Sequence, residues 1–426
     1  MIAQRPRVVP NWGIPMLYSI AALLGGLTLP RIESRLLPGV LAGISPAASL
    51  ALLSSIASGM MALTGVVFSL VFVMIQFSAA AYSPRLSLWV ARDRVIWHSL
   101  GIFTATFLYS IATMNWVDRY GSGRVPFFSS WLVTLLLVAS VCMFVALVDR
   151  VSMLQVHRML AFTGDQGRKV LEQMYPPLDA PSLTADAAEY RKLPVTQTLL
   201  HTGRPRVVQA VDEASLNGMA AEADAVVEVL SAVGDTVVIG TVLLRVHGGN
   251  KKLDEAALRE SIVLGDERTF EQDPKYALRL LVDIAVKALS PAINDPTTAV
   301  QALDQIEDLL RRLGNRRLEI GASYDSQGKL RLVTPQPSWD DFVRLSFDEI
   351  RAYGATSVQV MRRMNALASD LIAALPEERE MALRHHQKRL DATIARSFKY
   401  AEEKRQASVE DRQGLGASRN GGEDDD

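Results

Sequence analysis

Cysteine is nearly absent from the chain, and this absence excludes one class of protein directly. Cys142 is the single cysteine among 426 residues. An intramolecular disulfide needs two cysteines, so the chain cannot be a disulfide-stabilised secreted domain. The length instead leaves room for about two to four domains.

Charge is nearly absent from the first third. Residues 1–148 contain 9 Lys and Arg and 3 Asp and Glu, whereas residues 149–426 contain 36 and 43. So long a stretch with so little charge excludes a purely soluble protein and indicates membrane helices. The second part is acidic overall, which argues against nucleic acid as a partner, since such binding depends on Lys and Arg that neutralise phosphates.

Four uncharged runs predict a transmembrane helical domain at residues 1–150. A helix needs about 20 apolar residues to cross the hydrocarbon core. The predicted spans lie near residues 14–29, 50–81, 96–116 and 127–148. The second run is too long for one perpendicular span. No Asp, Glu, Lys or Arg falls inside any of the four, which argues against a proton-coupled carrier.

The distribution of arginine predicts the orientation of the chain. Four spans place both termini on the same side of the membrane. The loops and ends on that side carry Arg5, Arg7, Arg85, Arg92, Arg94, Arg150 and Arg158, and the opposite loops carry Arg31, Arg35, Arg119 and Arg124. Cytoplasmic loops carry the excess of Lys and Arg, so we expect both termini in the cytoplasm.

The second span carries a stripe of small and polar residues. Ser58, Ala62, Gly65, Ser69 and Gln76 follow at spacings of four, three, four and seven, which places them on one helix face. Small residues let helices approach closely in lipid. The stripe is therefore either a helix–helix contact or the lining of a pore in which Ser69 and Gln76 face water or ions. The sequence leaves both interpretations open.

The chain changes character after the spans. Residues 151–193 are predicted to be a juxtamembrane helix and a Pro-rich connector, and residues 194–250 a β module. Dense β-branched residues, punctuated by glycine turns, predict strands at 206–211, 225–230 and 241–246.

Part of the β module resembles a known fold. Residues 233–243 are similar to the closing half of a biotinyl/lipoyl-type barrel-sandwich hybrid, in which a Gly-Asp turn and a later glycine flank a short strand. Those carriers attach their cofactor to a lysine, and no lysine occurs between Lys192 and Lys251. We therefore expect a structural module without that cofactor.

Residues 251–404 are predicted to form a helical cytoplasmic domain. A short helix is expected at 253–264 and an amphipathic helix at 276–290, which Pro291 ends. Asp295 then suits the N-cap of the next helix and Pro296 its first position.

The fold class follows from these parts. We expect about four transmembrane helices, followed by a cytoplasmic α+β region with a small barrel-sandwich-like β module and helices. Residues 405–426 are polar and end in acidic residues, which predicts a disordered acidic tail.

Two sets of motifs resemble the bacterial predicted membrane proteins of domain-of-unknown-function family 2254. One set is Gly65–Ser69, Gln76–Ser78 and Ser83–Arg85. The other is the run LVDIAVKALSPAINDPTTA at 281–299, preceded by Arg268-Thr269 and Gln272-Asp273. From this second set the candidate site residues are Arg268, Gln272, Asp273, Asp283, Lys287, Ser290, Pro291, Asn294, Asp295 and Pro296.

The resemblance covers roughly residues 12–400. The chain departs from the family at Tyr276-Ala277, where an aromatic–glycine pair is expected, and at Ala292, where glycine is expected. The resemblance implies a multi-pass protein of the bacterial inner membrane. It implies no activity, since the family has no agreed one.

The motifs of common enzymes are missing. No phosphate loop, zinc-spaced Cys/His set, nucleophile elbow or dinucleotide fingerprint occurs, so we predict no catalytic residue, cofactor or metal ligand set. His385 and His386 are expected on the surface. Five oxygen-bearing residues allow two interpretations. They could form a cation site, because hard cations take carboxylate and amide ligands. The favoured interpretation is that they cap and pack the helices. The ligands of the cation site would be Gln272, Asp273, Asp283, Asn294 and Asp295.

Two non-enzymatic functions remain. The first is an oligomeric pore or transport-related protein with a cytoplasmic assembly or gating region. The second is a membrane-anchored sensor or scaffold, in which the helices only anchor and oligomerise while the soluble part binds an unidentified partner. Both predict a homo-oligomer in a lipid bilayer. The stripe on the second span favours the first.

Overall fold

The computed structural model describes residues 12–36, 44–81, 93–117, 119, 125–152, 156–180 and 189–415. The chain divides into two compact units. We call residues 4–155 the apolar unit and the residues from 156 onward the mixed unit.

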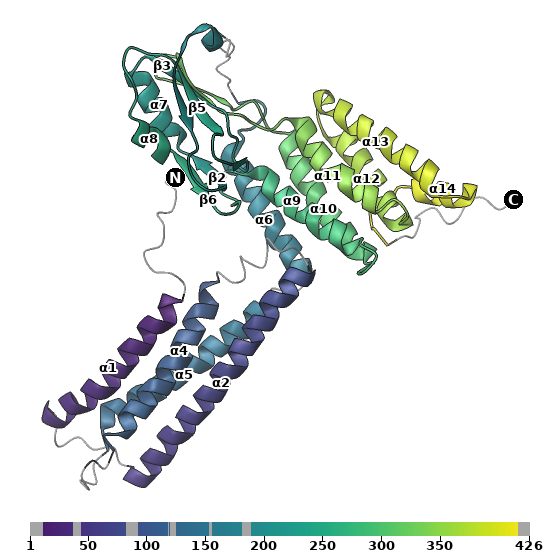
Figure 1. The fold of residues 1–426 in the computed structure, drawn as a ribbon. Helices are drawn as coiled ribbons and strands as arrows, with labels where there is room; N and C mark the ends of the chain where they lie inside the picture. The colour runs from purple at the N-terminus through teal and green to yellow at the C-terminus, as the bar shows by residue number, and fades with distance from the viewer. Residues whose placement is uncertain are drawn as a thin grey trace. The chain divides into compact units, whose positions relative to one another are not determined.

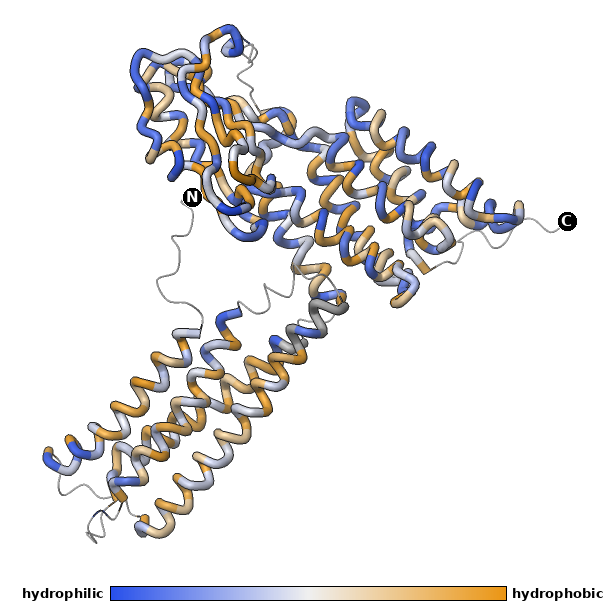
Figure 2. Tube along the Cα trace, in the orientation of Figure 1, coloured by the Kyte–Doolittle hydropathy of each residue, from blue (hydrophilic) through white to orange (hydrophobic). Residues whose placement is uncertain are grey.

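The apolar unit contains four long helices (Figure 1): α1 (Gly13–Leu36), α2 (Pro46–Ala81), α4 (Arg94–Met114) and α5 (Phe127–Ser152). All four are long and apolar enough to cross a membrane. Apolar residues run along most of their length, whereas the mixed unit alternates apolar and polar segments (Figure 2). The four helices predicted from the uncharged runs are confirmed, and α2 is one unbroken helix.

Helix α4 is the centre of the apolar unit and packs against α1, α2 and α5. Small residues allow α1 and α4 to approach closely. A Cβ added to Gly101 would lie 2.7 Å from Cδ2 of Tyr18, and one added to Gly26 would lie 2.6 Å from Cβ of Ala112. Between α4 and α5, the hydroxyls of Thr106 and Ser140 are hydrogen-bonded at 2.9 Å.

Helix α1 is longer than the predicted first span, and it contains a buried carboxylate. The helix continues past Pro30 to Leu36. Glu33 is only 6% exposed, and its carboxylate accepts hydrogen bonds from the backbone N–H groups of Phe128 (2.9 Å) and Ser129 (3.2 Å). Glu33 thus caps the free N–H groups at the start of α5. The predicted first span, 14–29, contains no acidic residue, but the helix extends beyond it and includes Glu33.

Strands and short helices form one part of the mixed unit. These are η2 (Glu189–Lys192), β1 (Val195–Leu200), β2 (Arg206–Val211), α7 (Glu213–Glu222), β3 (Ala225–Val229), β4 (Thr236–Val237), β5 (Val242–Gly248), α8 (Glu255–Glu260) and β6 (Ile262–Gly265). Two further strands, β7 (Ala322–Tyr324) and β8 (Leu330–Val333), follow later. The strands form a five-stranded sheet, in the order β1-β5-β3-β8-β7, and a three-stranded sheet, in the order β4-β2-β6.

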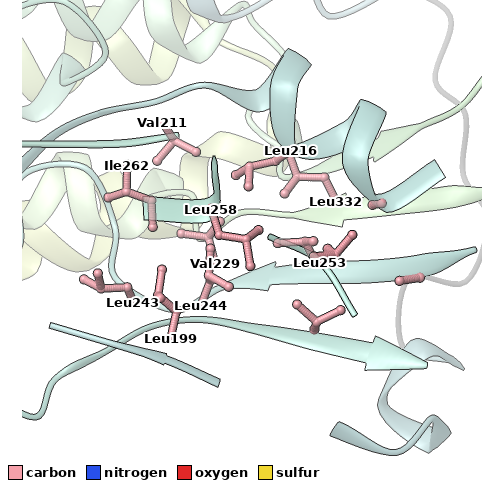
Figure 3. Close-up of a cluster of buried hydrophobic side chains, with 14 of the residues drawn as sticks. Leu199, Val211, Leu216, Val229, Leu243, Leu244, Leu253, Leu258, Ile262 and Leu332 are labelled. Atoms are coloured by element: carbon pink, nitrogen blue, oxygen red, sulfur yellow. The ribbon is translucent and has the colours of Figure 1, made fainter. Parts of the chain in front are cut away.

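Apolar side chains from both sheets and from α7 and α8 form one core (Figure 3). Leu216 of α7 and Leu258 of α8 pack among strand residues such as Val229, Leu244 and Leu332. The alternation of buried and exposed residues along the strands produces this core, because successive side chains of a strand point to opposite faces.

The β module has wider boundaries than residues 194–250. The segment predicted as one helix at 253–264 is the short helix α8, capped by Asp254, followed by strand β6. Strand β8 pairs with β3 in parallel, with Val227 opposite Leu332. This pairing joins residues about one hundred positions apart, which local patterns do not reveal.

Seven helices of the mixed unit form its second part. They are α6 (Val156–Met174), α9 (Pro274–Ala288), α10 (Pro296–Gly314), α11 (Trp339–Tyr353), α12 (Val358–Ala374), α13 (Glu377–Ser397) and α14 (Ala401–Ser408). Helix α6 lies within the segment predicted as a juxtamembrane helix and connector, and it packs on α9 and α10. Its Gly167 faces Leu309, and its Arg168 forms a 2.7 Å ion pair with Asp308.

The predicted disordered tail begins too early at residue 405. Helix α14 continues to Ser408, and Asp411 is 4% exposed. Arg412 binds the carboxylate of Asp370, and the Gly414 carbonyl accepts a hydrogen bond from Gln359. Polar contacts, rather than an apolar face, hold this segment in place. A prediction from its polar composition alone therefore gives disorder. Residues 416–426 lie outside the described residues.

Candidate functional site

The stripe on α2 faces away from the other helices of its own chain. Ser58, Gly65, Ser69 and Gln76 are all exposed. Val67 is fully buried against the neighbouring helices, and it lies nine residues, or about two and a half turns, from Ser58. No atom lies within 4 Å of the position that a Cβ of Gly65 would take. The stripe is therefore free to face lipid, water or another copy.

Large apolar side chains flank the stripe on both sides. Val66, Phe68, Phe72 and Val73 are 56–64% exposed. The Ser69 hydroxyl donates to the Gly65 carbonyl at 3.0 Å, so it is already satisfied within the helix. Of the related motif residues, the side chains of Phe77 and Ser78, and all of Ser83–Arg85, lie outside what the structure describes.

Helix α9 separates the candidate residues of the mixed unit into two groups. Arg268, Gln272 and Asp273 lie at its start, and Lys287 to Pro296 lie at its end. The helix has 15 residues, so the two ends are about 20 Å apart. The five oxygen-bearing residues considered as a cation site do not converge. Among the described residues, no group of three or more His, Cys, Asp or Glu could hold a metal.

The group at the end of α9 forms the predicted tight turn. The Ser290 carbonyl accepts hydrogen bonds from the N–H groups of Ile293 (3.0 Å) and Asn294 (2.9 Å). Asn294 adopts a left-handed conformation with φ of 50°. Asp295 caps α10 by accepting from the Thr298 N–H at 3.1 Å, and Pro296 is the first helical residue. Pro291 and the three residues after it are exposed.

Asp283 lies on α9 between the two groups, and Lys287 lies in the last turn of α9. The Asp283 carboxylate pairs with Arg279 at 2.5 Å, and Arg279 also binds Glu349 of α11 through two hydrogen bonds of 2.6 and 2.7 Å. This network joins α9 to α11. Lys287 lies one turn further along α9 and is half-buried.

The group at the start of α9 is built around a buried ion pair. The Arg268 Nε donates to Asp273 Oδ2 at 2.6 Å, and the Asp273 side chain is 1% exposed. Gly234, with φ of +93°, allows the turn before β4 to lie directly against this pair. The side-chain amide of Gln272 binds the backbone of Val211 twice. Its oxygen accepts from the Val211 N–H at 2.9 Å, and its nitrogen donates to the Val211 carbonyl at 3.2 Å. The first motif group therefore fixes α9 to β2 and to the Gly234 turn.

A pocket of about 350 Å³ opens beside this ion pair, where three helices begin. Its polar lining comes from Glu213 at the start of α7, Asp273 and Lys275 at the start of α9, Asp341 in the first turn of α11, and the segment after β8. The full lining is Gln173, Met174, Val211, Glu213, Val229, Ser231, Ala232, Val233, Gln272, Asp273, Pro274, Lys275, Ile320, Thr334, Pro335, Gln336, Pro337 and Asp341.

Two carboxylates of the pocket have raised pKa values. Burial raises the pKa of Asp273, and the pairing with Arg268 only partly opposes this effect. Asp273 Oδ1 has no hydrogen-bond partner, although it is shielded from solvent. Glu213 is exposed as a residue, but neighbouring protein atoms displace water from its carboxyl group, which raises the pKa. Burial and the nearby charge of Asp273 also raise the pKa of Tyr175. A charged carboxylate is costly here unless a donor reaches it.

Comparison with known proteins identifies the family. The family described as predicted membrane protein (DUF2254) matches residues 10–369. The chain is a member of DUF2254. Uncharacterized proteins of Mycobacterium bovis and Mycobacterium tuberculosis are each 26% identical to it over 382 residues, which cover 85% of this chain and 70% of each relative. No solved structure matches the chain.

In this DUF2254 protein, reasoning from the sequence missed most of the pocket. Glu213, Lys275 and Thr334 belong to no motif. Thr334 directly follows β8, so the pairing of β8 with β3 brings it to the pocket. Glu213 and Lys275 reach the pocket from the first turns of α7 and α9. Pro274, the first residue of α9, was the available signal, because proline at the first helical position marks where free N–H groups lie.

His386 is a correction to the expected surface histidines. It is 6% exposed and packs against Phe347, with ring centroids 5.4 Å apart. Burial lowers its pKa, although Asp348 opposes the shift. The charged residues around it in the sequence suggest an exposed helix, but α13 turns this face towards α11. His385 is exposed, as predicted.

Proposed function

We propose that this DUF2254 protein is an oligomeric pore or transport-related protein of the bacterial inner membrane. In this proposal, the α2 helices of several copies meet along the small and polar stripe, and the mixed unit assembles or gates the oligomer. Both termini are cytoplasmic. The β module serves as a barrel-sandwich-like structural element without a prosthetic group.

One observation carries the proposal: among the residues that the structure describes, the stripe on α2 has no partner within its own chain. A helix face that contacted only lipid would gain nothing from Ser58, Gly65, Ser69 and Gln76, since apolar side chains suit lipid at least as well. An amide left without a hydrogen bond in an apolar medium costs about 2–7 kcal/mol. Gln76 therefore favours a neighbour that is water or protein.

Flux through reconstituted liposomes tests the proposal. We expect the wild-type chain to dissipate a potassium gradient, and Ser69→Leu or Gln76→Leu to reduce the rate by about tenfold, which corresponds to about 1.4 kcal/mol. Val66→Leu is the matched control, because Val66 is an exposed residue of the same helix outside the stripe. No flux from the wild-type chain under any imposed gradient would contradict the pore.

The pocket in the mixed unit favours a second candidate, a membrane-anchored sensor or scaffold. Here α2 only holds copies together, and ligand binding in the mixed unit changes its contacts with a partner. This candidate expects Gly65→Leu to disperse the oligomer while no variant produces or removes ion flux.

A further inference from the structure

We propose that the pocket at the start of α7, α9 and α11 binds an organic ammonium cation, a diamine or polyamine with short methylene spacers. This inference does not depend on whether α2 lines a pore. It follows from the charge of the lining, the placement of its carboxylates on different helices and the apolar side chains that also line the pocket.

The lining carries more negative than positive charge. Glu213, Asp273 and Asp341 contribute carboxylates, and Lys275 contributes the single ammonium group among the lining residues. Asp341 is already engaged, because it accepts from the N–H and hydroxyl of Ser338 and pairs with Arg344 at 2.6 Å. The Thr334 side chain is the one hydrogen-bond partner among the groups that shift the pKa of Glu213, and Asp273 Oδ1 has no partner, so these two residues are the acidic groups with acceptor capacity left for a ligand.

Asp273 has unused capacity for a hydrogen bond. Its Oδ2 binds Arg268, whereas Oδ1 has no partner and the side chain is 1% exposed. It stands at the N-cap of α9 without making a cap hydrogen bond. Gln272 cannot bind the ligand instead, because the oxygen and the nitrogen of its side-chain amide are both hydrogen-bonded to the backbone of Val211. A buried acceptor without a partner is unfavourable, and a charged donor would remove that penalty.

The placement of the two carboxylates on different helices favours an extended ligand over a metal ion. Glu213 and Asp273 come from different helices, and among the described residues no three acidic, His or Cys side chains are grouped closely enough for a metal. Apolar side chains of Met174, Val233 and Ile320 also line the pocket. Methylene groups between two ammonium ends suit such a lining, and a volume of about 350 Å³ admits a small organic molecule.

Lys275 distinguishes a cation site from an anion site. Its ammonium group lies near Asp273 and Asp341 and competes with an incoming amine for the same carboxylates. Replacing Lys275 by Gln should therefore strengthen amine binding. For an anionic ligand held by Lys275 and the helix N-termini, the same substitution would weaken binding.

Spermidine binding to the full chain in lipid nanodiscs, measured by isothermal titration calorimetry, tests the inference. We expect saturable binding that Glu213→Gln and Asp273→Asn each weaken by about tenfold or more, corresponding to about 1.4 kcal/mol, and that Lys275→Gln strengthens. Glu222→Gln is the matched control, because Glu222 is an exposed carboxylate at the other end of α7 and should leave the affinity unchanged.

Glu213→Gln keeps the test valid even if Asp273→Asn fails to fold, since Glu213 is an exposed first-turn residue. Three results would overturn the inference: no spermidine binding to the wild-type chain, equal binding by wild type and Glu213→Gln, or binding of inorganic phosphate in place of spermidine that Lys275→Gln abolishes. None of these results bears on ion flux, so failure here is distinguishable from failure of the pore.

Discussion

Gly234→Ala is expected to destabilise the mixed unit far more than Gly240→Ala. Both glycines have positive φ, +93° and +86°, so alanine is strained by about 1–2 kcal/mol at either position. They differ in their surroundings. A Cβ at Gly234 would lie 2.7 Å from both the guanidinium carbon of Arg268 and Oδ2 of Asp273, whereas a Cβ at Gly240 would meet nothing within 4 Å.

The extra effect at Gly234 comes from the buried ion pair. The added methyl group would separate Arg268 from Asp273 and leave a carboxylate that is 1% exposed without its partner. Breaking a buried pair costs about 3–5 kcal/mol, which should lower the melting temperature by roughly 10 °C relative to Gly240→Ala. Thermal unfolding of both variants in detergent measures the difference. Equal melting temperatures would show that the Gly234 turn is not held against the ion pair.

Gly101→Leu and Gly65→Leu should separate the folding of the apolar unit from its assembly. Gly101 faces Tyr18, whose ring occupies the space a side chain would need and whose hydroxyl is hydrogen-bonded to Nδ1 of His98 at 3.2 Å. Leucine there forces α1 from α4, and overpacking of this kind costs about 1–3 kcal/mol or more. Gly65 has open space around it, so leucine should leave the single chain folded.

Two measurements distinguish the leucine variants: the unfolding temperature in detergent and the particle mass. We expect Gly101→Leu to lower the unfolding temperature in detergent, and Gly65→Leu to keep the wild-type temperature while shifting the particle mass from oligomer to monomer in mass photometry. Unchanged oligomer mass in Gly65→Leu would mean that copies do not meet through this part of α2.

Local signals in the sequence predicted local structure well. Uncharged runs predict the four apolar helices, since only a helix satisfies all its own backbone hydrogen bonds in lipid. Asp295 and Pro296 predict the start of α10, and the glycine turns and β-branched runs predict β2, β3 and β5. Each of these features depends on residues a few positions apart.

Features that depend on distant residues were not predictable. The true contact between α1 and α4 uses Gly26 against Ala112 and Gly101 against Tyr18, although the stripe on α2 has the more conspicuous pattern. The helix α1 passes Pro30 because Glu33 is anchored to the start of α5. The pocket needs β8 beside β3, and no local pattern encodes that pairing.

Cysteine accessibility at neighbouring positions of α2 tests most directly whether the stripe faces a polar axis. In a Cys142→Ser background, Ser69→Cys and Phe68→Cys place single thiols on adjacent exposed residues that point in directions about 100° apart. With a membrane-impermeant thiol reagent applied to native membranes, the account predicts that Ser69→Cys is modified and Phe68→Cys is not. Failure of both thiols to react, or equal reaction of both, would contradict it.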